Sequence, residues 1–176
     1  MLRPATEADK ESIRVWRNHP QVREVSLTRD VISVQEHQRY WDSLQDNPSR
    51  IVLMYDRGET PSGVVTFFDI GQVATEDTAA GTERHAMWGY YLDNDGLQDR
   101  GELIPAWIKI QREAVRYAFD ELGLDQLDGE VLDANEAVRR MNTRNGFEEI
   151  SATEHTIDGE QVLVHTIRRR RQQRDN

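Results

Sequence analysis

Hydrophobic residues recur along this chain with two different periods, which distinguish predicted helices from predicted strands. A spacing of three to four residues is typical of an amphipathic helix, and strict alternation is typical of a half-buried strand. Helical spacing covers residues 7–18, 34–44, 102–122 and 135–145. Strand patterns cover residues 2–5, 51–55, 63–70, 85–92, 127–132, 147–152 and 162–167. The predicted order is therefore β-α-α-β-β-β-α-β-α-β-β, without an internal repeat or a linker between domains.

Residues at the expected helix ends support these boundaries. Thr6 precedes the first helix with Asp9 three residues on, and Ser33 is placed to cap the second helix. Short polar side chains at this position accept hydrogen bonds from the free N–H groups of the first turn. His19-Pro20 ends the first helix, because the residue before a proline is pushed out of helical geometry.

Three places interrupt the regular pattern. Residues 71–84 are polar and lack any period, so they are predicted to form a mobile hairpin loop that is longer than usual. Residues 158–159, an Asp-Gly pair between the last two strands, predict a tight hairpin turn. In the longest helix, Ile104 and Ile108 share the apolar spacing with one polar residue, Gln111.

Composition narrows the class of protein. The chain has 176 residues, of which 37% are hydrophobic and 31% charged, and this length suits one compact domain. Cysteine is absent, so neither a disulfide nor a thiolate metal site is expected, and the five histidines show no ligand spacing for a metal. No apolar run approaches the ~20 residues that span a bilayer, and the N-terminus lacks an apolar signal segment. We therefore expect a cytoplasmic protein without a membrane partner.

The net charge of -10 argues against nucleic acid as the main partner, because phosphates repel an acidic surface. The charge is nevertheless uneven, since residues 168–174 read Arg-Arg-Arg-Arg-Gln-Gln-Arg. We predict a domain over residues 1–168 followed by a basic, flexible tail over residues 169–176. A contact of this tail with RNA or a phosphate is the alternative.

The segment 117–149 carries the most specific pattern, reading YAFDELGLDQLDGEVLDANEAVRRMNTRNGFEE. It resembles the C-terminal half of the GCN5-related N-acetyltransferases (GNAT), and the predicted element order resembles that fold over nearly the whole chain. The resemblance implies an α/β (α+β) domain with a mixed, mostly antiparallel sheet of six to seven strands, flanked by helices and splayed at the acyl-CoA site. It also implies acetyl-CoA as co-substrate. Relatives of this fold often dimerise, and a homodimer is left open.

The first half of the chain resembles the branch that acetylates nucleotide-linked 4-amino sugars. The resemblance is carried by Trp16, Arg17, Asn18, Arg23, His37 and Trp41, together with Val22 and Ile32. It implies that the first six bind the acceptor, in a pocket where arginines neutralise a diphosphate and tryptophans stack on a ring. The tryptophans are equally suited to the hydrophobic core, and His37 to a semi-buried position on an apolar helix face.

The resemblance also implies where acetyl-CoA binds. The acyl-pantetheine arm would lie between the strand at 85–92 and the strand at 127–132, bonded to exposed backbone groups by strand addition. The pyrophosphate would lie at the N-terminus of the long helix, where free N–H groups and the helix dipole favour an anion. The implied contacts are Tyr91, Leu92, Asp93, Arg100, Gly101, Glu102, Leu103, Asn135 and Asn142.

Amine acetylation needs a base for the amine, donors for the oxyanion and a proton for the leaving thiolate. Glu130 holds the position of a strand carboxylate that serves as base in some ribosomal-protein acetyltransferases, and His85 is the rival base. Backbone N–H groups near Tyr91 and Leu92 are the candidate oxyanion donors, since the family fold opens a bulge there. Both Glu130 and His85 could also be ordinary surface residues.

Two motifs depart from the family pattern. In the phosphate loop, Q/R-x-x-G-x-G/A, Leu103 and Pro105 replace two small residues. Asn142 occupies the position of the tyrosine that protonates the departing thiolate, and an amide cannot act as a general acid. The proton must then come from water or another residue, for which the candidates are Tyr90, Tyr91 and Tyr117.

Three functions remain in view from the sequence. The first is an N-acetyltransferase (an acyltransferase) that moves acetyl from acetyl-CoA to a primary amine, preferably on a nucleotide-linked amino sugar. The second takes protein N-termini as acceptors, as ribosomal-protein N-terminal acetyltransferases do. The third is a GNAT-fold protein that has lost acetyl transfer and serves as a binding module or catalyses another reaction, a hypothesis motivated by the two departures.

Overall fold

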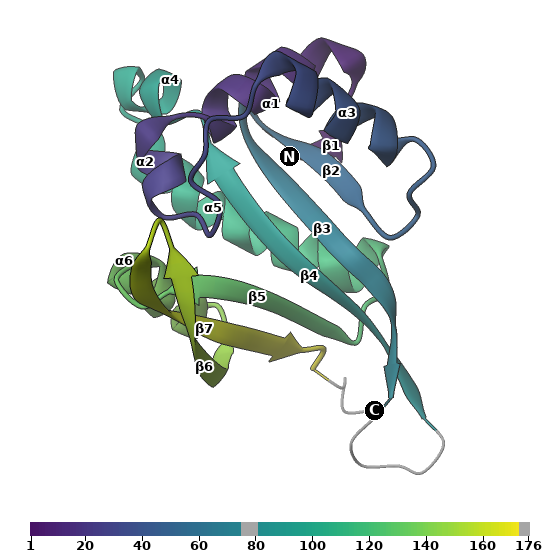
Figure 1. Cartoon of the computed structure of the whole chain (residues 1–176). Helices are drawn as coiled ribbons and strands as arrows, with labels where there is room; N and C mark the ends of the chain where they lie inside the picture. The colour runs from purple at the N-terminus through teal and green to yellow at the C-terminus, as the bar shows by residue number, and fades with distance from the viewer. Residues whose placement is uncertain (75–80, 173–176) are drawn as a thin grey trace.

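One seven-stranded sheet runs through the computed structural model, which describes residues 1–74 and 81–172 (Figure 1). The strand order is β1-β2-β3-β4-β5-β7-β6, and all neighbours are antiparallel except the parallel pair β4 and β5. The strands are β1 (Leu2–Pro4), β2 (Ile51–Arg57), β3 (Thr60–Ala74), β4 (Thr82–Leu92), β5 (Gln126–Leu132), β6 (Glu148–Ile157) and β7 (Glu160–Arg170). The mixed, mostly antiparallel sheet is the predicted one.

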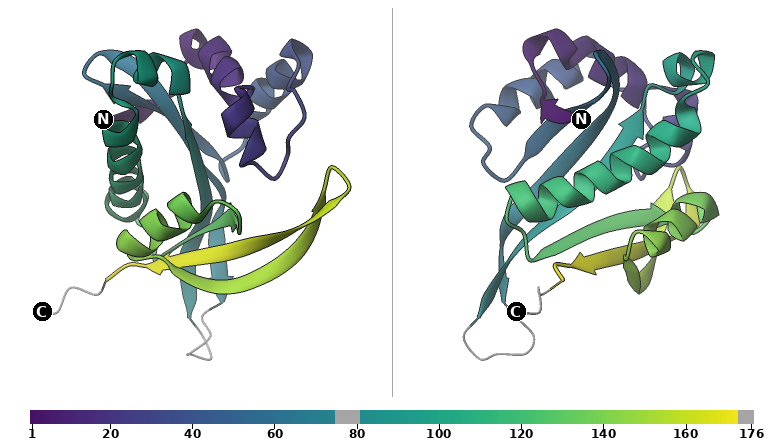
Figure 2. Two further views of the ribbon diagram at one scale, coloured as in Figure 1. Left: turned by 90° about the vertical axis from the view of Figure 1, so that its left-hand side faces the viewer. Right: turned by 180° about the vertical axis from the view of Figure 1, so that it is seen from behind.

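Helices cover both faces of this sheet. In Figure 1 α1 and α3 lie in front of the strands, and the view from behind in Figure 2 shows α5 and α6 on the opposite face. A 3₁₀ turn (Glu7–Asp9) precedes α1 and a π turn (Tyr117–Glu121) follows α5. The helices are α1 (Lys10–Arg17), α2 (Pro20–Glu24), α3 (Val34–Leu44), α4 (Asn94–Asp99), α5 (Leu103–Arg116) and α6 (Glu136–Arg144).

Each face of the sheet has its own core. The α5 face buries the larger one, where Phe67, Trp88 and Ile110 pack together with their neighbours. The opposite face buries a smaller core around Ile13 and Trp41. Because successive strand residues point to opposite faces, adjacent residues of β4 contribute to different cores.

The β4–β5 pair divides the sheet. The two strands are paired only over four residues each, His85–Trp88 with Gln126–Gly129. Beyond that point β4 stays paired with β3 as far as Leu92, and β5 stays paired with β7 as far as Leu132. The two strands therefore separate into a fork, and Figure 1 shows their ends diverging. A Cβ on Gly129 would lie 3.1 Å from Trp88 Nε1, so glycine permits the close approach at the base of the fork.

The predicted helix ends are confirmed. Thr6 and Asp9 form a reciprocal capping box, and so do Ser33 and Glu36. Two short helices were missing from the predicted order. Pro20 occupies the first turn of α2, where the backbone N–H that proline lacks would have no partner within the helix. The Asp93 carboxylate caps α4 by accepting from Gly96 N at 3.1 Å.

The predicted loop at 71–84 and the apolar stripe of the long helix need correction. Gly71–Ala74 pairs with Thr82–His85, so the ladder of β3 and β4 continues into this segment, while residues 75–80 lie outside the described residues. In α5, Ile104 and Ile108 are 65% and 38% exposed. The buried face does include the predicted Gln111 and Val115, and Ala106, Ile110 and Ala114 complete it.

The predicted boundary between domain and tail was three residues too early. Arg169 and Arg170 belong to β7, and Arg170 Nη1 lies 2.6 Å from Glu83 Oε2. Arg171 Nε donates to the Leu124 carbonyl at 3.0 Å. These arginines bind groups of the fold, whereas residues 173–176 lie outside the described residues.

Candidate active site

A cavity of about 240 Å³ opens at the fork between β4 and β5. Its walls are formed by the ends of these two strands together with α2, α5 and α6, and Trp88 lies at its base. In an antiparallel ladder every second residue directs its N–H and C=O away from its partner. The β4 segment Gly89–Leu92 and residues Glu130 and Val131 of β5 therefore present unpaired backbone groups to the cavity, which fit an extended chain with amide groups.

A buried polar network forms the α5–α6 wall of the cavity. The Tyr90 hydroxyl accepts hydrogen bonds from Trp107 Nε1 at 2.7 Å and from Gln111 Nε2 at 3.0 Å. The same Gln111 amide donates to Asn142 Oδ1 at 2.9 Å, and Asn145 Nδ2 donates to Gln111 Oε1. Burial raises the pKa of Tyr90, and the bonds from Gln111 and Trp107 oppose that shift. The phenol is thus neutral at physiological pH.

Tyr91 points to the opposite face of the sheet. Its hydroxyl lies 3.4 Å from the Ile13 carbonyl of α1, to which it donates, and burial raises its pKa as well. Glu130 extends from β5 opposite Thr166, is exposed and borders the cavity. It is the carboxylate in the cavity wall, so it is placed to accept a proton from an amine directly or through water.

The other wall is formed by α2 and the segment that follows it. Asn18 holds this segment, because its amide group donates to the Ile32 carbonyl and accepts from Ile32 N, both at 2.8 Å. Arg23 Nε donates to the Arg29 carbonyl at 2.6 Å. Arg17 Nη2 donates to the Thr28 carbonyl at 2.9 Å, whereas Arg17 Nη1 is buried and has no hydrogen-bond partner among the described residues. Burial lowers the pKa of Arg17.

Known proteins share this architecture. A family model described as "Acetyltransferase (GNAT) domain" matches residues 1–148. This chain belongs to the GNAT acetyltransferase family. Two curated relatives are the acetyltransferase PseH of Campylobacter jejuni subsp. jejuni strains 81-176 and NCTC 11168. They are 24% and 25% identical over 149 residues, which cover 83% of this chain and 83% of each relative.

Solved structures show the same fold. Spermidine N-acetyltransferase from Vibrio cholerae, in a crystal structure with CoA and spermine, superposes with a TM-score of 0.80 at 16% identity over 97% of this chain and 94% of that one. A putative phosphinothricin N-acetyltransferase gives 0.71 at 18% identity over 97% of both chains. The family's acyl donor is acetyl-CoA, and the fork of this GNAT protein has the unpaired strand edges that suit its pantetheine arm. Within the described ranges, no helix is long and apolar enough to cross a membrane.

The structure brings together six of the residues predicted for the site. They all border the cavity of this GNAT domain and are Tyr90, Tyr91, Leu92, Glu130, Asn135 and Asn142. The prediction missed the cavity residues Gln21, Ser26, Asn94 and Trp107, as well as Gln111 behind them. Gln111 did leave a signal, since it was the one polar residue on an apolar helical stripe.

The predicted bulge at Tyr91 and Leu92 is absent from the β3–β4 ladder, where these residues pair in unbroken register with Val64 and Gly63. The register shift lies between Phe68 and Gly71 instead. Divergence from β5, rather than a bulge against β3, therefore frees the backbone of β4. Oxyanion donation by these N–H groups stays a prediction.

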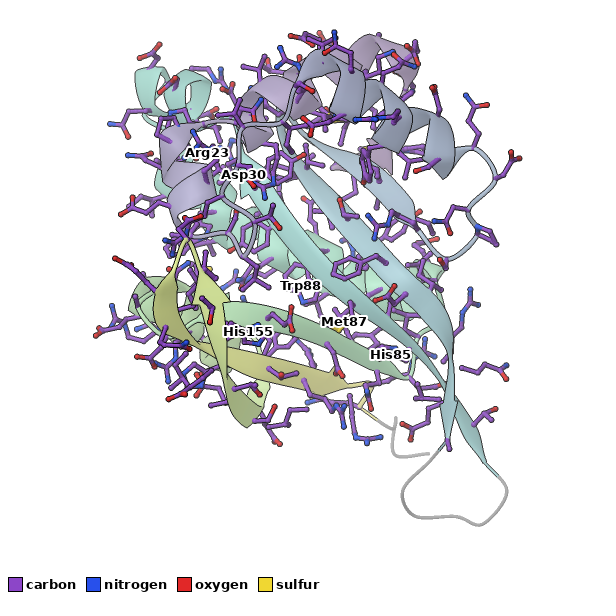
Figure 3. The ribbon with its side chains drawn as sticks, viewed as in Figure 1. Arg23, Asp30, His85, Met87, Trp88 and His155 are labelled. Carbon is purple, nitrogen blue, oxygen red and sulfur yellow. The ribbon has the colours of Figure 1, made fainter. Side chains whose placement is uncertain are left out.

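His85 lies outside the cavity, near the start of β4. Figure 3 shows it on the far side of Met87 from Trp88. Its Nε2 is 3.6 Å from Asp128 Oδ2, and Asp128 in turn binds Arg168 Nη2 at 2.8 Å. This ion-pair cluster joins the closed part of the β4–β5 pair to β7, which favours a structural role for His85.

None of the six predicted acceptor residues borders the cavity itself. His37 is buried and its Nε2 bonds to the Lys10 carbonyl at 2.8 Å, while Trp16 and Trp41 pack in the smaller core. Packing thus accounts for these three side chains. The remaining residues, Arg17, Asn18 and Arg23, hold the segment after α2 next to the cavity, and of these Arg17 has a free, buried nitrogen.

The predicted pyrophosphate residues also lie outside the cavity wall. The Glu102 carboxylate is bound by Arg57 Nη2 at 3.0 Å and by Arg100 Nε at 3.4 Å, and Arg100 Nη2 donates to Ser62 Oγ at 3.3 Å. The pKa of Glu102 is lowered chiefly by Arg57. Its charge is thus partly compensated, which reduces repulsion of a nearby phosphate. The phosphate contacts of Arg100, Gly101, Glu102, Leu103 and Asp93 stay predictions.

Proposed function

We propose that this GNAT protein moves the acetyl group of acetyl-CoA to the primary amine of a nucleotide-linked amino sugar in the cytoplasm. The family and the two acetyltransferase relatives support acetyl transfer. The resemblance of the residues from Trp16 to Trp41 to the amino-sugar branch supports the acceptor class. The unpaired nitrogen of Arg17 is the structural observation that supports an anionic acceptor.

A buried guanidinium nitrogen without an acceptor is costly, because it has lost water without gaining a hydrogen bond. Arg17 Nη1 is in this situation, and no carboxylate within the described residues forms an ion pair with Arg17. An anionic group on the acceptor would supply the missing partner, and phosphate is bound well by the planar donor fork of arginine. The diphosphate of a sugar nucleotide has this chemistry.

The reaction then runs across the cavity. The neutral amine attacks the thioester carbon, and Glu130 takes the proton that the nitrogen loses as the C–N bond forms, directly or through water. Unpaired N–H groups of Gly89–Leu92 stabilise the oxyanion that forms. Collapse of the tetrahedral intermediate breaks the C–S bond and leaves the amide and CoA.

Arg17 also weighs against a polyamine acceptor. The likeness to spermidine N-acetyltransferase, at 16% identity, extends to the fold. A polycation next to a buried, unpaired guanidinium would be repelled, whereas an anion would be attracted. A protein N-terminus is the alternative acceptor, and its amine brings no fixed anion for Arg17.

The test measures acetyl-dependent release of CoA thiol by the purified full chain. The acceptor panel contains a uridine-diphosphate-linked 4-amino sugar, the same amino sugar without the nucleotide, N-terminal peptides and spermidine. We expect kcat/KM for the nucleotide-linked sugar to exceed that for the free sugar by about 100-fold, the range of one buried charged contact. A preference for peptides or spermidine would overturn the acceptor proposal.

Calorimetric titration of acetyl-CoA, with desulfo-CoA as the matched ligand, tests the donor half separately. Micromolar binding is expected, and it would show that Leu103 and Pro105 are compatible with the phosphate site. Absence of binding at millimolar ligand would support the loss of acetyl transfer in this chain.

A further inference from the structure

We propose that Tyr90 supplies the proton to the thiolate of CoA as it leaves, in place of a tyrosine at position 142. This assignment rests on the proposed acetyl transfer and names the proton donor of that same site. It follows from the side chains that surround the Tyr90 hydroxyl and from the chemistry of the C–S bond cleavage.

The hydrogen bonds around Tyr90 leave its proton free to be donated. The hydroxyl oxygen accepts from Trp107 Nε1 and Gln111 Nε2, neither of which can accept in return through that nitrogen. Within the part of the chain that the structure describes, no acceptor is bonded to the Tyr90 O–H. Tyr90 borders the cavity at the fork, so the proton is available to a group bound there.

The same two donors prepare the oxygen for the loss of its proton. Two N–H groups directed at one oxygen stabilise a phenolate more than a phenol, because bonds to a charged acceptor are the stronger ones. The donors are themselves fixed, since the Gln111 amide is also bonded to Asn142 Oδ1 and receives a bond from Asn145. Asn142 thus takes part in the site by orienting Gln111.

The other tyrosines considered for this role are placed differently. Tyr91 borders the same cavity, but its hydroxyl is directed to the opposite face of the sheet and donates to the Ile13 carbonyl. Tyr117 stacks on Phe67 at a centroid distance of 6.0 Å and does not border the cavity. Of the three, Tyr90 has its hydroxyl on the wall that holds Asn142.

The step balances without a further reactant. The tetrahedral intermediate carries the oxyanion, the acceptor nitrogen and the CoA sulfur on one carbon. Re-formation of the C=O bond breaks the C–S bond, and the electron pair of that bond leaves with sulfur. Tyr90 transfers its proton to this sulfur, giving neutral CoA thiol and a phenolate held by Trp107 and Gln111. The proton that Glu130 took from the acceptor nitrogen returns through water to the phenolate after the products leave, so both side chains regain their starting states.

Tyr90→Phe tests the assignment, with Tyr117→Phe as matched control. Removal of a general acid typically costs 10²–10⁴-fold, and a thiolate is a tolerable leaving group, so we expect kcat to fall about 100-fold. The KM for acetyl-CoA should change little, and Tyr117→Phe should keep wild-type turnover. The double variant Tyr90→Phe/Asn142→Tyr, which returns a phenol to the same wall, should recover at least 10-fold of the loss.

A fluorinated tyrosine introduced at position 90 separates proton donation from packing. The analogue keeps the ring and hydroxyl but is a stronger acid. Because burial raises the pKa of Tyr90, a more acidic phenol should donate its proton faster and raise kcat at neutral pH. An unchanged kcat with the analogue, or a Tyr90→Phe variant with wild-type kcat, would overturn the assignment. A wild type that turns over no amine would instead overturn the acetyl-transfer proposal itself, so the two failures are distinguishable.

Discussion

The two walls of the cavity differ in how their polar groups are satisfied. On the α5–α6 wall, Tyr90, Trp107, Gln111 and Asn142 bind one another in a neutral network. Behind the α2 wall, side chains bind backbone carbonyls, and Arg17, which does not itself border the cavity, has a buried nitrogen with no partner among the described residues. The first set of polar groups is thus satisfied in the free protein, whereas the second leaves one cationic nitrogen unpaired.

This difference indicates which substrate each wall serves. A completed network holds its groups in place before any ligand binds, which suits chemistry at a thioester common to the whole family. A wall with an unpaired cation binds an anionic ligand more tightly than a neutral or cationic one. Such a difference in affinity suits selection of the acceptor. If the proposed function holds, catalysis and specificity belong to opposite sides of the fork.

Replacement of Arg17 should give the largest effect, a loss of activity with the nucleotide-linked acceptor. In Arg17→Gln, we expect kcat/KM for a nucleotide-linked amino sugar to fall about 100-fold, because the phosphate loses its charged partner. Activity with the free amino sugar should fall less than threefold. Arg140→Gln, which removes an exposed arginine paired with Glu136 on α6, is the control. Equal losses with both acceptors would indicate that Arg17 only supports the fold.

Loss of a hydrogen-bonding side chain from the α5–α6 wall should lower the stability of the folded protein. Gln111→Leu leaves Asn142 Oδ1 without its donor and removes one of the two donors to the Tyr90 hydroxyl, which keeps Trp107 Nε1. An orphaned buried group costs about 1–3 kcal/mol. We therefore expect the free energy of unfolding in urea to fall by about 2 kcal/mol. Gln35→Leu, at an exposed position of α3, should change it by less than about 0.5 kcal/mol. An unchanged unfolding midpoint for Gln111→Leu would show that the network is not stabilising.

Much of the fold was predictable because local chemistry and tertiary packing agree. The helix Val34–Leu44 has its predicted bounds, since Ser33 and Glu36 satisfy its first turn and Trp41 is buried. The short helices α2 and α4 were not predictable, because five or six residues show too little periodicity. The polar ladder Gly71–Ala74 was missed for a related reason. It is exposed, so backbone pairing stabilises it without an apolar pattern.

The sequence predicted which strands form the site, but not which side chains bond to one another there. The resemblance indicated the fork, and Glu130, Asn135 and Asn142 do border the cavity. Alternation along a strand shows that Tyr90 and Tyr91 point to opposite faces, but not which face holds Gln111. That information resides in the packing of α5 on the sheet, and no local pattern encodes it.

Acid should destabilise the α2 side of the cavity at a higher pH than the α5–α6 wall. This is the smallest of the expected effects. Arg3 holds the Asp9 carboxylate with Nη1 at 2.7 Å and Nη2 at 2.8 Å at the start of α1, the helix that carries Arg17. This contact lowers the pKa of Asp9 from 3.8 to about 2. Because the folded pKa is the lower one, its stabilisation is present above about pH 4 and is lost as the pH falls toward 2. The network around Tyr90 is neutral throughout this window.

Asp9→Asn isolates this contribution from the other carboxylates that titrate in the same range. Since Arg3 is partly exposed and solvent screens its charge, we expect the variant to be less stable than wild type by about 1 kcal/mol at pH 6. The difference should shrink toward zero at pH 2, where the wild-type carboxylate is itself becoming protonated. Urea unfolding at both pH values measures it, and hydrogen exchange at pH 3 should show faster opening of α1 than of α5. Equal destabilisation at pH 6 and pH 2 would mean that Asp9 acts through its shape as a cap rather than its charge, and both walls would then respond alike to acid.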